Sequence, residues 1–159
     1  MLSFRKITFA ILFLISACGF SPLYNNNNFA KLAGNIDLQE PNTQNEFVFY
    51  SQFKNYFSEV NSKYFLTYAI TTSKKDSALN FDGTVHRIEI SGSVAFSIKE
   101  KENGLEILSG REETSLSYSN FGSTAAVLNA ERTSNKQLVV LLADKVADRI
   151  SLMVVEKDL

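Results

Sequence analysis

The longest regular pattern in the chain is an alternation of apolar and polar residues between positions 87 and 98. One side of this segment carries Ile88, Ile90, Gly92, Val94, Phe96 and Ile98. The other side carries Arg87, Glu89, Ser91, Ser93 and Ser97. A period of two over this length predicts a long strand with one buried face.

A second segment of the same kind follows. Residues 101–104 contain the Asn-Gly pair that is typical of hairpin turns. Behind this turn, one face carries Leu108, Gly110, Thr114, Leu116 and Tyr118. The opposite face carries Ser109, Arg111, Glu113, Ser115 and Ser117. Two such strands joined by a short turn predict an antiparallel hairpin with one solvent-exposed face.

Weaker patterns predict the remaining strands. Residues 36–39 form a short alternating strand that ends before Pro41. Residues 64–72 are rich in aromatic and β-branched side chains, which favour a strand. The polar residues 73–77 are expected to break this strand or to make it irregular.

Two helices are predicted. Thr43 and Glu46 have the spacing of a capping box. They precede a helix of about four turns with an aromatic stripe, which we interpret as core; the stripe contains Phe49, Phe53, Phe57 and Val60, with Tyr56 beside it. The second helix runs from about residue 123 to the low 150s, and one side carries Leu138, Leu142, Val146, Ile150 and Met153. Its first half is more polar, so we expect it to lie partly off the core or to pack against another protein.

The predicted order is therefore β-α-β-β-β-α. We expect an α+β fold in which two helices pack on one face of a mostly antiparallel four-stranded sheet. The opposite face would be exposed and rich in serine, threonine, arginine and glutamate.

The N-terminal residues have the three parts of a secretory signal peptide. Arg5 and Lys6 precede ten mostly apolar residues, too few for a transmembrane helix, and Ala17 and Cys18 follow. Residues 15–18 resemble the bacterial lipobox, which predicts cleavage before Cys18 and a diacylglycerol and an N-acyl chain on that cysteine. Gly19 at the next position favours the outer membrane. An unmodified cysteine after a signal peptide is the alternative.

These signals divide the chain into a signal peptide at 1–17, a lipidated N-terminus and tether at 18–34, and one domain at 35–159. Cys18 is the only cysteine, so an intramolecular disulfide is excluded. Without residues 1–17 the net charge is about −3, which argues against nucleic-acid binding. Stability must therefore come from packing.

Candidate catalytic residues are few. His86 is the only histidine, and no nucleophile motif flanks it. Glu112 and Glu113 are adjacent on a predicted strand, so they point to opposite faces and cannot act together on one bond. The sequence contains no glycine-rich phosphate loop and no metal-ligand spacing. We expect a binding or assembly protein that is not an enzyme and needs neither metal nor cofactor.

Four segments carry a family resemblance. They are CGFSPLY at 18–24, DGTVHR at 82–87, SYSN at 117–120, and the helix 125–132 that continues into 141–150. Their order resembles the lipopolysaccharide (LPS) assembly lipoprotein family LptE, particularly its alphaproteobacterial branch. The SYSN segment resembles the family's Ser-Tyr-Asn pattern with one extra serine.

The resemblance implies a lipoprotein of the outer membrane that forms a one-to-one complex with the β-barrel LptD. It would plug the barrel, help its assembly, and deliver LPS to the outer leaflet. Cations would bind the phosphates of lipid A: we expect Arg87 and Arg111 on the polar strand face to do so, with Lys74 and Lys75 in the adjoining loop. The alternatives are a different outer-membrane lipoprotein that acts as a barrel-assembly accessory or periplasmic scaffold, and a lipid-anchored enzyme, which the residue inventory disfavours.

Overall fold

The computed structural model describes residues 35–57, 62–79 and 85–156. The predicted signal peptide, the predicted tether and Cys18 lie outside the described residues. The elements, in chain order, are β1 (Ile36–Leu38), α3 (Gln44–Phe53), β2 (Tyr64–Leu79), β3 (Val85–Glu100), β4 (Glu106–Ser119) and α4 (Thr124–Glu156).

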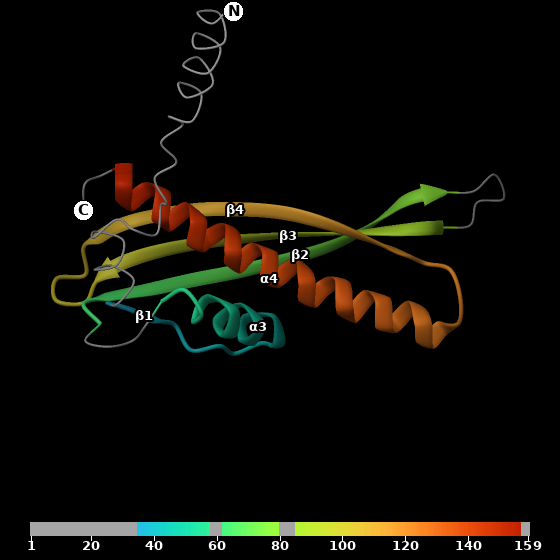
Figure 1. Ribbon diagram of the computed structural model, residues 1–159, viewed down its shortest axis with the longest axis horizontal. Coiled ribbons are helices and arrows are strands. Elements are labelled where there is room, and N and C mark those ends of the chain that lie inside the picture. The colour runs from blue at the N-terminus through green and yellow to red at the C-terminus, as the bar shows by residue number, and fades with distance from the viewer. Residues whose placement is uncertain (1–34, 58–61, 80–84, 157–159) are drawn as a thin grey trace, which may run out of the picture.

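The four strands form one sheet in the order β1-β2-β3-β4. β1 pairs with β2 in parallel, whereas β2 with β3 and β3 with β4 are antiparallel. Figure 1 shows α4 running obliquely along the three long strands, with α3 beside it. The predicted α+β fold, its element order and its mostly antiparallel sheet are confirmed.

The start of α3 has the predicted capping box. The amide of Glu46 donates to Thr43 Oγ1 over 3.2 Å, and the amide of Thr43 donates to Glu46 Oε2, also over 3.2 Å. The helix is shorter than expected, however, because it ends at Phe53 after 10 residues. After the helix, the chain continues in turns closed by hydrogen bonds between residues three apart. Phe57 lies beyond the helix but is still buried. Val60 lies outside the described residues.

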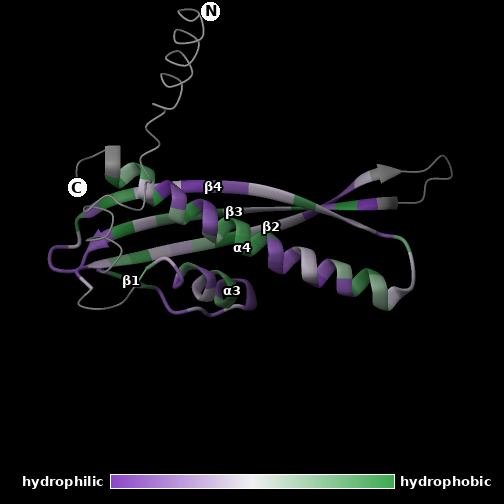
Figure 2. Cartoon of the chain, viewed as in Figure 1, coloured by the Kyte–Doolittle hydropathy of each residue, from purple (hydrophilic) through white to green (hydrophobic). Residues whose placement is uncertain are grey.

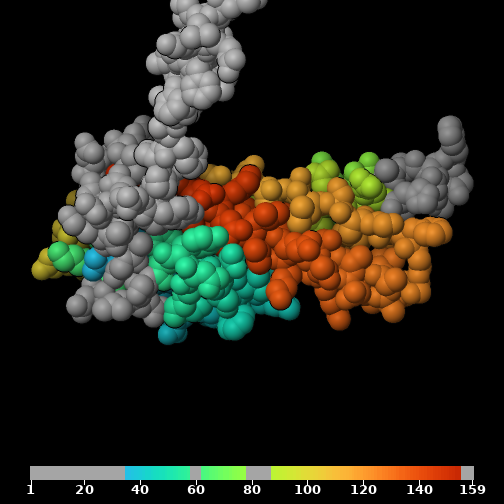
Figure 3. Space-filling view, viewed as in Figure 1, coloured from blue at the N-terminus to red at the C-terminus, as the bar shows by residue number. Residues whose placement is uncertain are grey.

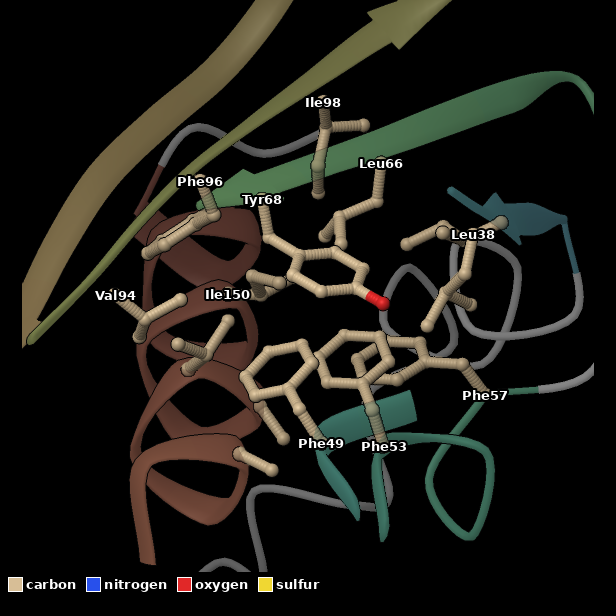
Figure 4. Packing of buried hydrophobic residues seen from close by; sticks show 14 of the residues in the cluster. Leu38, Phe49, Phe53, Phe57, Leu66, Tyr68, Val94, Phe96, Ile98 and Ile150 are labelled. Carbon is tan, nitrogen blue, oxygen red and sulfur yellow. The ribbon is translucent and has the colours of Figure 1, made fainter. Parts of the chain in front are cut away.

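The main core lies between the two helices and the adjoining half of the sheet. Phe53 stacks on Phe49 and on Phe57, with ring centroids 5.6 and 4.3 Å apart. Tyr68 of β2 lies over Phe49 at 4.6 Å, and its burial raises its pKa to about 12. Figure 4 shows these aromatic rings facing Ile150 of α4 and the inner side chains of the strands. The aromatic stripe is therefore core, as predicted.

β2 is longer than the sequence pattern predicted. It continues through residues 73–77 to Leu79, with irregular pairing to β3 on both sides of Ala78. The expected irregularity is present, but the strand does not break. Lys74 and Lys75 therefore lie in a strand and not in a loop, because pairing with β3 outweighs the weak strand preference of polar residues.

The β3–β4 hairpin turns where the Asn-Gly pair predicts it. Gly104 has φ of 70°, a left-handed conformation that glycine adopts without strain. Asn103 Oδ1 accepts a hydrogen bond from the amide of Leu105, and this bond within the turn stabilises it. Figure 2 shows hydrophobic residues recurring along β3, whereas the middle of β4 is a continuous hydrophilic stretch.

α4 buries the line of apolar residues that its sequence predicts. Leu138, Leu142, Val146 and Ile150 are fully buried, while Met153 is only partly buried and Val154 takes the last core position. The polar first half of the helix is attached to the sheet by a second, smaller apolar cluster, formed by Ile90, Tyr118 and Leu138 with Ile88, Leu116, Val127 and Ala130 packed against it.

Candidate functional site

The sheet face opposite the helices carries small hydroxyl side chains from three strands. Cross-strand register places Ser91 between Ser73 and Ser115, and Ser93 beside Thr71. We call the face formed by these five residues the hydroxyl face. Together with Arg111 and Glu113 they line an open depression of about 450 Å³. Its many donors and acceptors suit a polar partner or ligand.

Arg111 lies on the hydroxyl face, as predicted. Its Nε donates to Glu113 Oε1 over 2.8 Å, and its Nη2 donates to Ser93 Oγ over 3.0 Å. The guanidinium is therefore neutralised by a carboxylate on its own strand. Any anionic ligand would have to compete with Glu113.

Lys75 also projects from the sheet on this side, where its Nζ lies 3.4 Å from Glu89 Oε2. Ser91 Oγ donates to the other oxygen of the same carboxylate over 3.4 Å. Lys75 is therefore paired with a carboxylate from β3, and Arg111 with a carboxylate from β4. The face is polar but gains no net charge from these pairs.

Lys74 lies on the opposite face, under α4. Its Nζ forms an ion pair with Glu131 Oε1, and the Tyr118 hydroxyl donates to Glu131 Oε2 over 3.4 Å. The hydrogen bond with Glu131 raises the pKa of Lys74, and the same bond lowers the pKa of Glu131. The structure thus separates Lys74 from the other predicted contacts and gives it a role in attaching α4 to the sheet.

Arg87 is exposed near the start of β3, opposite Ser119 of β4. It lies four residues from Ser91, or about 13 Å along the strand. Within the described part of the chain its guanidinium has no ion pair. The four predicted cations are therefore dispersed over the sheet and do not form one cluster.

The carboxylates of Glu112 and Glu113 point to opposite faces, as predicted. Glu113 binds Arg111 on the hydroxyl face, whereas Glu112 Oε1 lies 3.9 Å from Arg149 Nε of α4. Across the described ranges, no cluster of three or more potential metal ligands occurs. None of the described helices is long and apolar enough to cross a membrane.

A polar groove that the sequence analysis did not identify lies between the start of α3 and the first half of α4. It has a volume of about 260 Å³, and its lining includes Asn45, Arg132, Asn135 and Lys136. We call it the basic groove. Arg132 and Lys136 are four residues apart on a helix, a spacing that sequence can show. The crossing of the two helices, which makes the groove, is visible only in the folded chain.

No family model matches the chain, and no curated protein sequence matches it either. Solved structures do match. A lipoprotein from Caulobacter crescentus has a TM-score of 0.66 at 16% identity, and the match covers 83% of this chain and 98% of that one. The chain has the fold of a bacterial lipoprotein.

Two further structures support this assignment of the fold. Rare lipoprotein B from Shewanella oneidensis has a TM-score of 0.62 at 14% identity, covering 79% of this chain and 98% of that one. Lipoprotein B from Nitrosomonas europaea has a TM-score of 0.61 at 11% identity, with coverage of 76% and 84%. Each of the three matches therefore covers at least 76% of this chain and at least 84% of the other chain.

Proposed function

We propose that this protein is an outer-membrane lipoprotein of the LptE family that plugs the LptD β-barrel, helps its assembly, and takes part in delivering LPS to the outer leaflet. The family resemblance of the sequence suggests this role. The lipoprotein fold, together with the lipobox around Cys18, agrees with it.

The hydroxyl face is the observation that carries the proposal. The interior of an outer-membrane barrel is polar and hydrated, so a protein that fills it needs a polar surface. On this face Arg111 is paired with Glu113, and Lys75 with Glu89. Hydroxyl groups such as those of Ser91 and Ser93 can exchange hydrogen bonds with water for hydrogen bonds with a barrel wall at little cost.

Co-purification tests the partnership. A tagged full-length protein, extracted in mild detergent, should carry LptD with it in a one-to-one ratio, and depletion of the protein should leave LptD misassembled. Absence of LptD from the complex would exclude the proposal. Capture of a different barrel or of a periplasmic scaffold would instead favour the alternative of an assembly accessory.

The proposal assigns no catalytic role to His86, which belongs to β3. We expect His86→Ala to leave barrel assembly and LPS export unchanged. A loss of LPS export with intact barrel assembly in this variant would point instead to the lipid-anchored enzyme.

The lipid anchor has its own test. Cys18→Ala should move the protein from the outer-membrane fraction to the soluble periplasmic fraction. If the soluble variant still assembles with LptD, the anchor only raises the local concentration at the membrane.

A further inference from the structure

The Asn-Gly pair of the β3–β4 turn has a chemical property that the proposed function does not use. An asparagine amide is one of the chemically unstable groups of proteins. Its carbon Cγ can be attacked by the backbone nitrogen of the next residue, and glycine, which has no side chain, hinders that approach least. Asn103 and Gly104 are the only such pair in the sequence, and both are exposed. Figure 3 shows this turn, in yellow, at one end of the molecule.

The reaction has two steps and needs water as its only co-reactant. The Gly104 nitrogen bonds to Asn103 Cγ, the Cγ–Nδ2 bond breaks, and ammonia leaves with the proton of the Gly104 amide. The product is a five-membered succinimide ring. Water then opens the ring. Its attack on the side-chain carbonyl gives aspartate, and its attack on the main-chain carbonyl gives isoaspartate, in which the backbone runs through Cβ and Cγ.

The folded turn engages every group that takes part in the first step. The Gly104 amide, which is the attacking group, donates to the Glu100 backbone oxygen over 2.9 Å. Asn103 Nδ2, which is the leaving group, donates to Glu100 Oε2 over 2.7 Å. Asn103 Oδ1 accepts from the amide of Leu105 over 2.8 Å. The side-chain amide is therefore fixed at both ends while the attacking nitrogen is bonded elsewhere, so the closed turn should react slowly.

Glu100 supplies two of these three acceptors, one from its backbone and one from its side chain. The side-chain bond is the one that a substitution can remove without changing the backbone. Glu102, the other carboxylate of the turn, is exposed, and the side-chain bonds of Asn103 go to Glu100 and Leu105 instead. We propose that Asn103 is a latent self-modification site, which forms isoaspartate when the turn opens, and that the Glu100 carboxylate sets the rate.

The modification would reach beyond the turn through Lys101. The Lys101 ammonium donates to Asp37 Oδ2 over 2.8 Å and to Ser62 Oγ over 2.7 Å. Asp37 is the middle residue of β1, so this lysine holds β1 to the hairpin. Isoaspartate at position 103 lengthens the backbone of the turn by one atom and adds a negative charge beside Glu100. Lys101 would lose its fixed position, and its hold on β1 would weaken.

Timed incubation of the full-length protein in detergent at neutral pH tests the site. The test variant is Glu100→Ala. The matched control, Glu102→Ala, removes the same charge from the same turn and leaves the bonds of Asn103 in place. A peptide of residues 99–107 is the unfolded reference. Mass spectrometry of digested samples follows isoaspartate at position 103, which is diagnostic because only the cyclic route forms it.

We expect the peptide to react about tenfold or more faster than the wild type, because the turn bonds are absent from it. Glu100→Ala should react about two- to tenfold faster than the wild type, the factor that loss of one hydrogen bond gives. Glu102→Ala should stay within about twofold of the wild type. Both variants should melt as the wild type does, since neither side chain belongs to the core. In modified wild type, the amides of β1 should exchange with deuterium faster than in fresh protein.

A wild type that reacts as fast as the peptide would overturn the proposal, because the turn would then give no protection. Equal rates in the two variants would overturn it as well, since the local charge and not the Glu100 bond would set the rate. A peptide without isoaspartate would show that the pair is unreactive. Unchanged exchange of β1 in modified protein would refute the link through Lys101. None of these results depends on LptD, so the proposed function stands or fails separately.

Discussion

A side chain at Gly92 would collide with Leu138: a Cβ atom there would lie 2.9 Å from Leu138 Cδ2 and 3.0 Å from Leu142 Cδ1. Gly92 is on the inner face of β3, where α4 crosses the sheet. Both leucines are fully buried, so they have little room to move. The missing side chain thus sets how closely α4 approaches the sheet.

Gly92→Ala should therefore destabilise the domain by about 1 to 3 kcal/mol, the usual cost of an extra methyl group in a packed core. Urea unfolding followed by circular dichroism measures this loss. Ser93→Ala, on the opposite face of the same strand, is the matched control and should change the free energy of unfolding by less than about 0.5 kcal/mol. An unchanged unfolding midpoint for Gly92→Ala would mean that α4 can move away from the sheet freely.

Asp144 connects the two helices. Its Oδ1 accepts hydrogen bonds from Gln52 Nε2 over 2.8 Å and from the Tyr56 hydroxyl over 2.9 Å. Asp144→Ala leaves both donors without this acceptor, so we expect a loss of about 1 to 3 kcal/mol in the free energy of unfolding. The exposed Asp148 provides the control, since Asp148→Ala should have little effect. If the two variants unfold alike, the α3–α4 contact does not depend on these bonds.

The ion pair between Lys74 and Glu131 gives a pH dependence with a definite sign. Glu131 has a pKa below its usual value of 4.5, so its contribution is present above pH 4.5 and is lost as the pH falls through the lowered pKa. Lys74 has a pKa above 10.5, so its contribution is present below pH 10.5 and is lost as the pH rises through the raised pKa. The pair stabilises the fold throughout the range between.

A double-mutant cycle with Lys74→Met and Glu131→Gln measures this pair. We expect a coupling energy of about 0.2 to 1 kcal/mol at pH 7, the range for exposed ion pairs. The coupling should disappear in acid once Glu131 is protonated. A coupling that persists at pH 2 would show that packing, and not charge, joins the two side chains.

The hydroxyl face gives a prediction about the proposed partner. Ser93→Arg puts a long cation into the depression beside Arg111, so a barrel wall could no longer approach closely. We expect much less LptD in the co-purified complex, with an unchanged melting temperature because the side chain is outside the core. Gln137→Arg, on the exposed side of α4, is the control for added charge. Equal recovery of LptD with both variants would show that the barrel contacts a different surface.

Sequence periodicity predicted most of the fold because the information is local. The capping box of Thr43 and Glu46 involves residues three apart, and the alternation along β3 and β4 directly reports one buried face. Errors arose where a distant segment decides the outcome. The aromatic stripe predicted a longer helix because Phe57 continues its spacing. In the structure Phe57 lies beyond the end of α3, and tertiary packing buries it there.

The candidate site was less predictable for the same reason. Lys74 and Glu131 are 57 positions apart, so no local pattern shows that they form an ion pair. The basic groove between α3 and α4 likewise requires the folded chain. Sequence could show that Arg132 and Lys136 are one turn apart, but not that α3 forms the other wall.

The short strand β1 has a mechanical consequence. It joins the sheet through three residues, Ile36–Leu38, whereas β2 and β3 are each 16 residues long. A pulling force on the chain ahead of β1 reaches the sheet through this brief pairing with β2. Under tension β1 would peel away first, and the long hairpins would hold. The domain would therefore open first at β1, where a membrane tether would pull, and the longer strands that follow would stay paired.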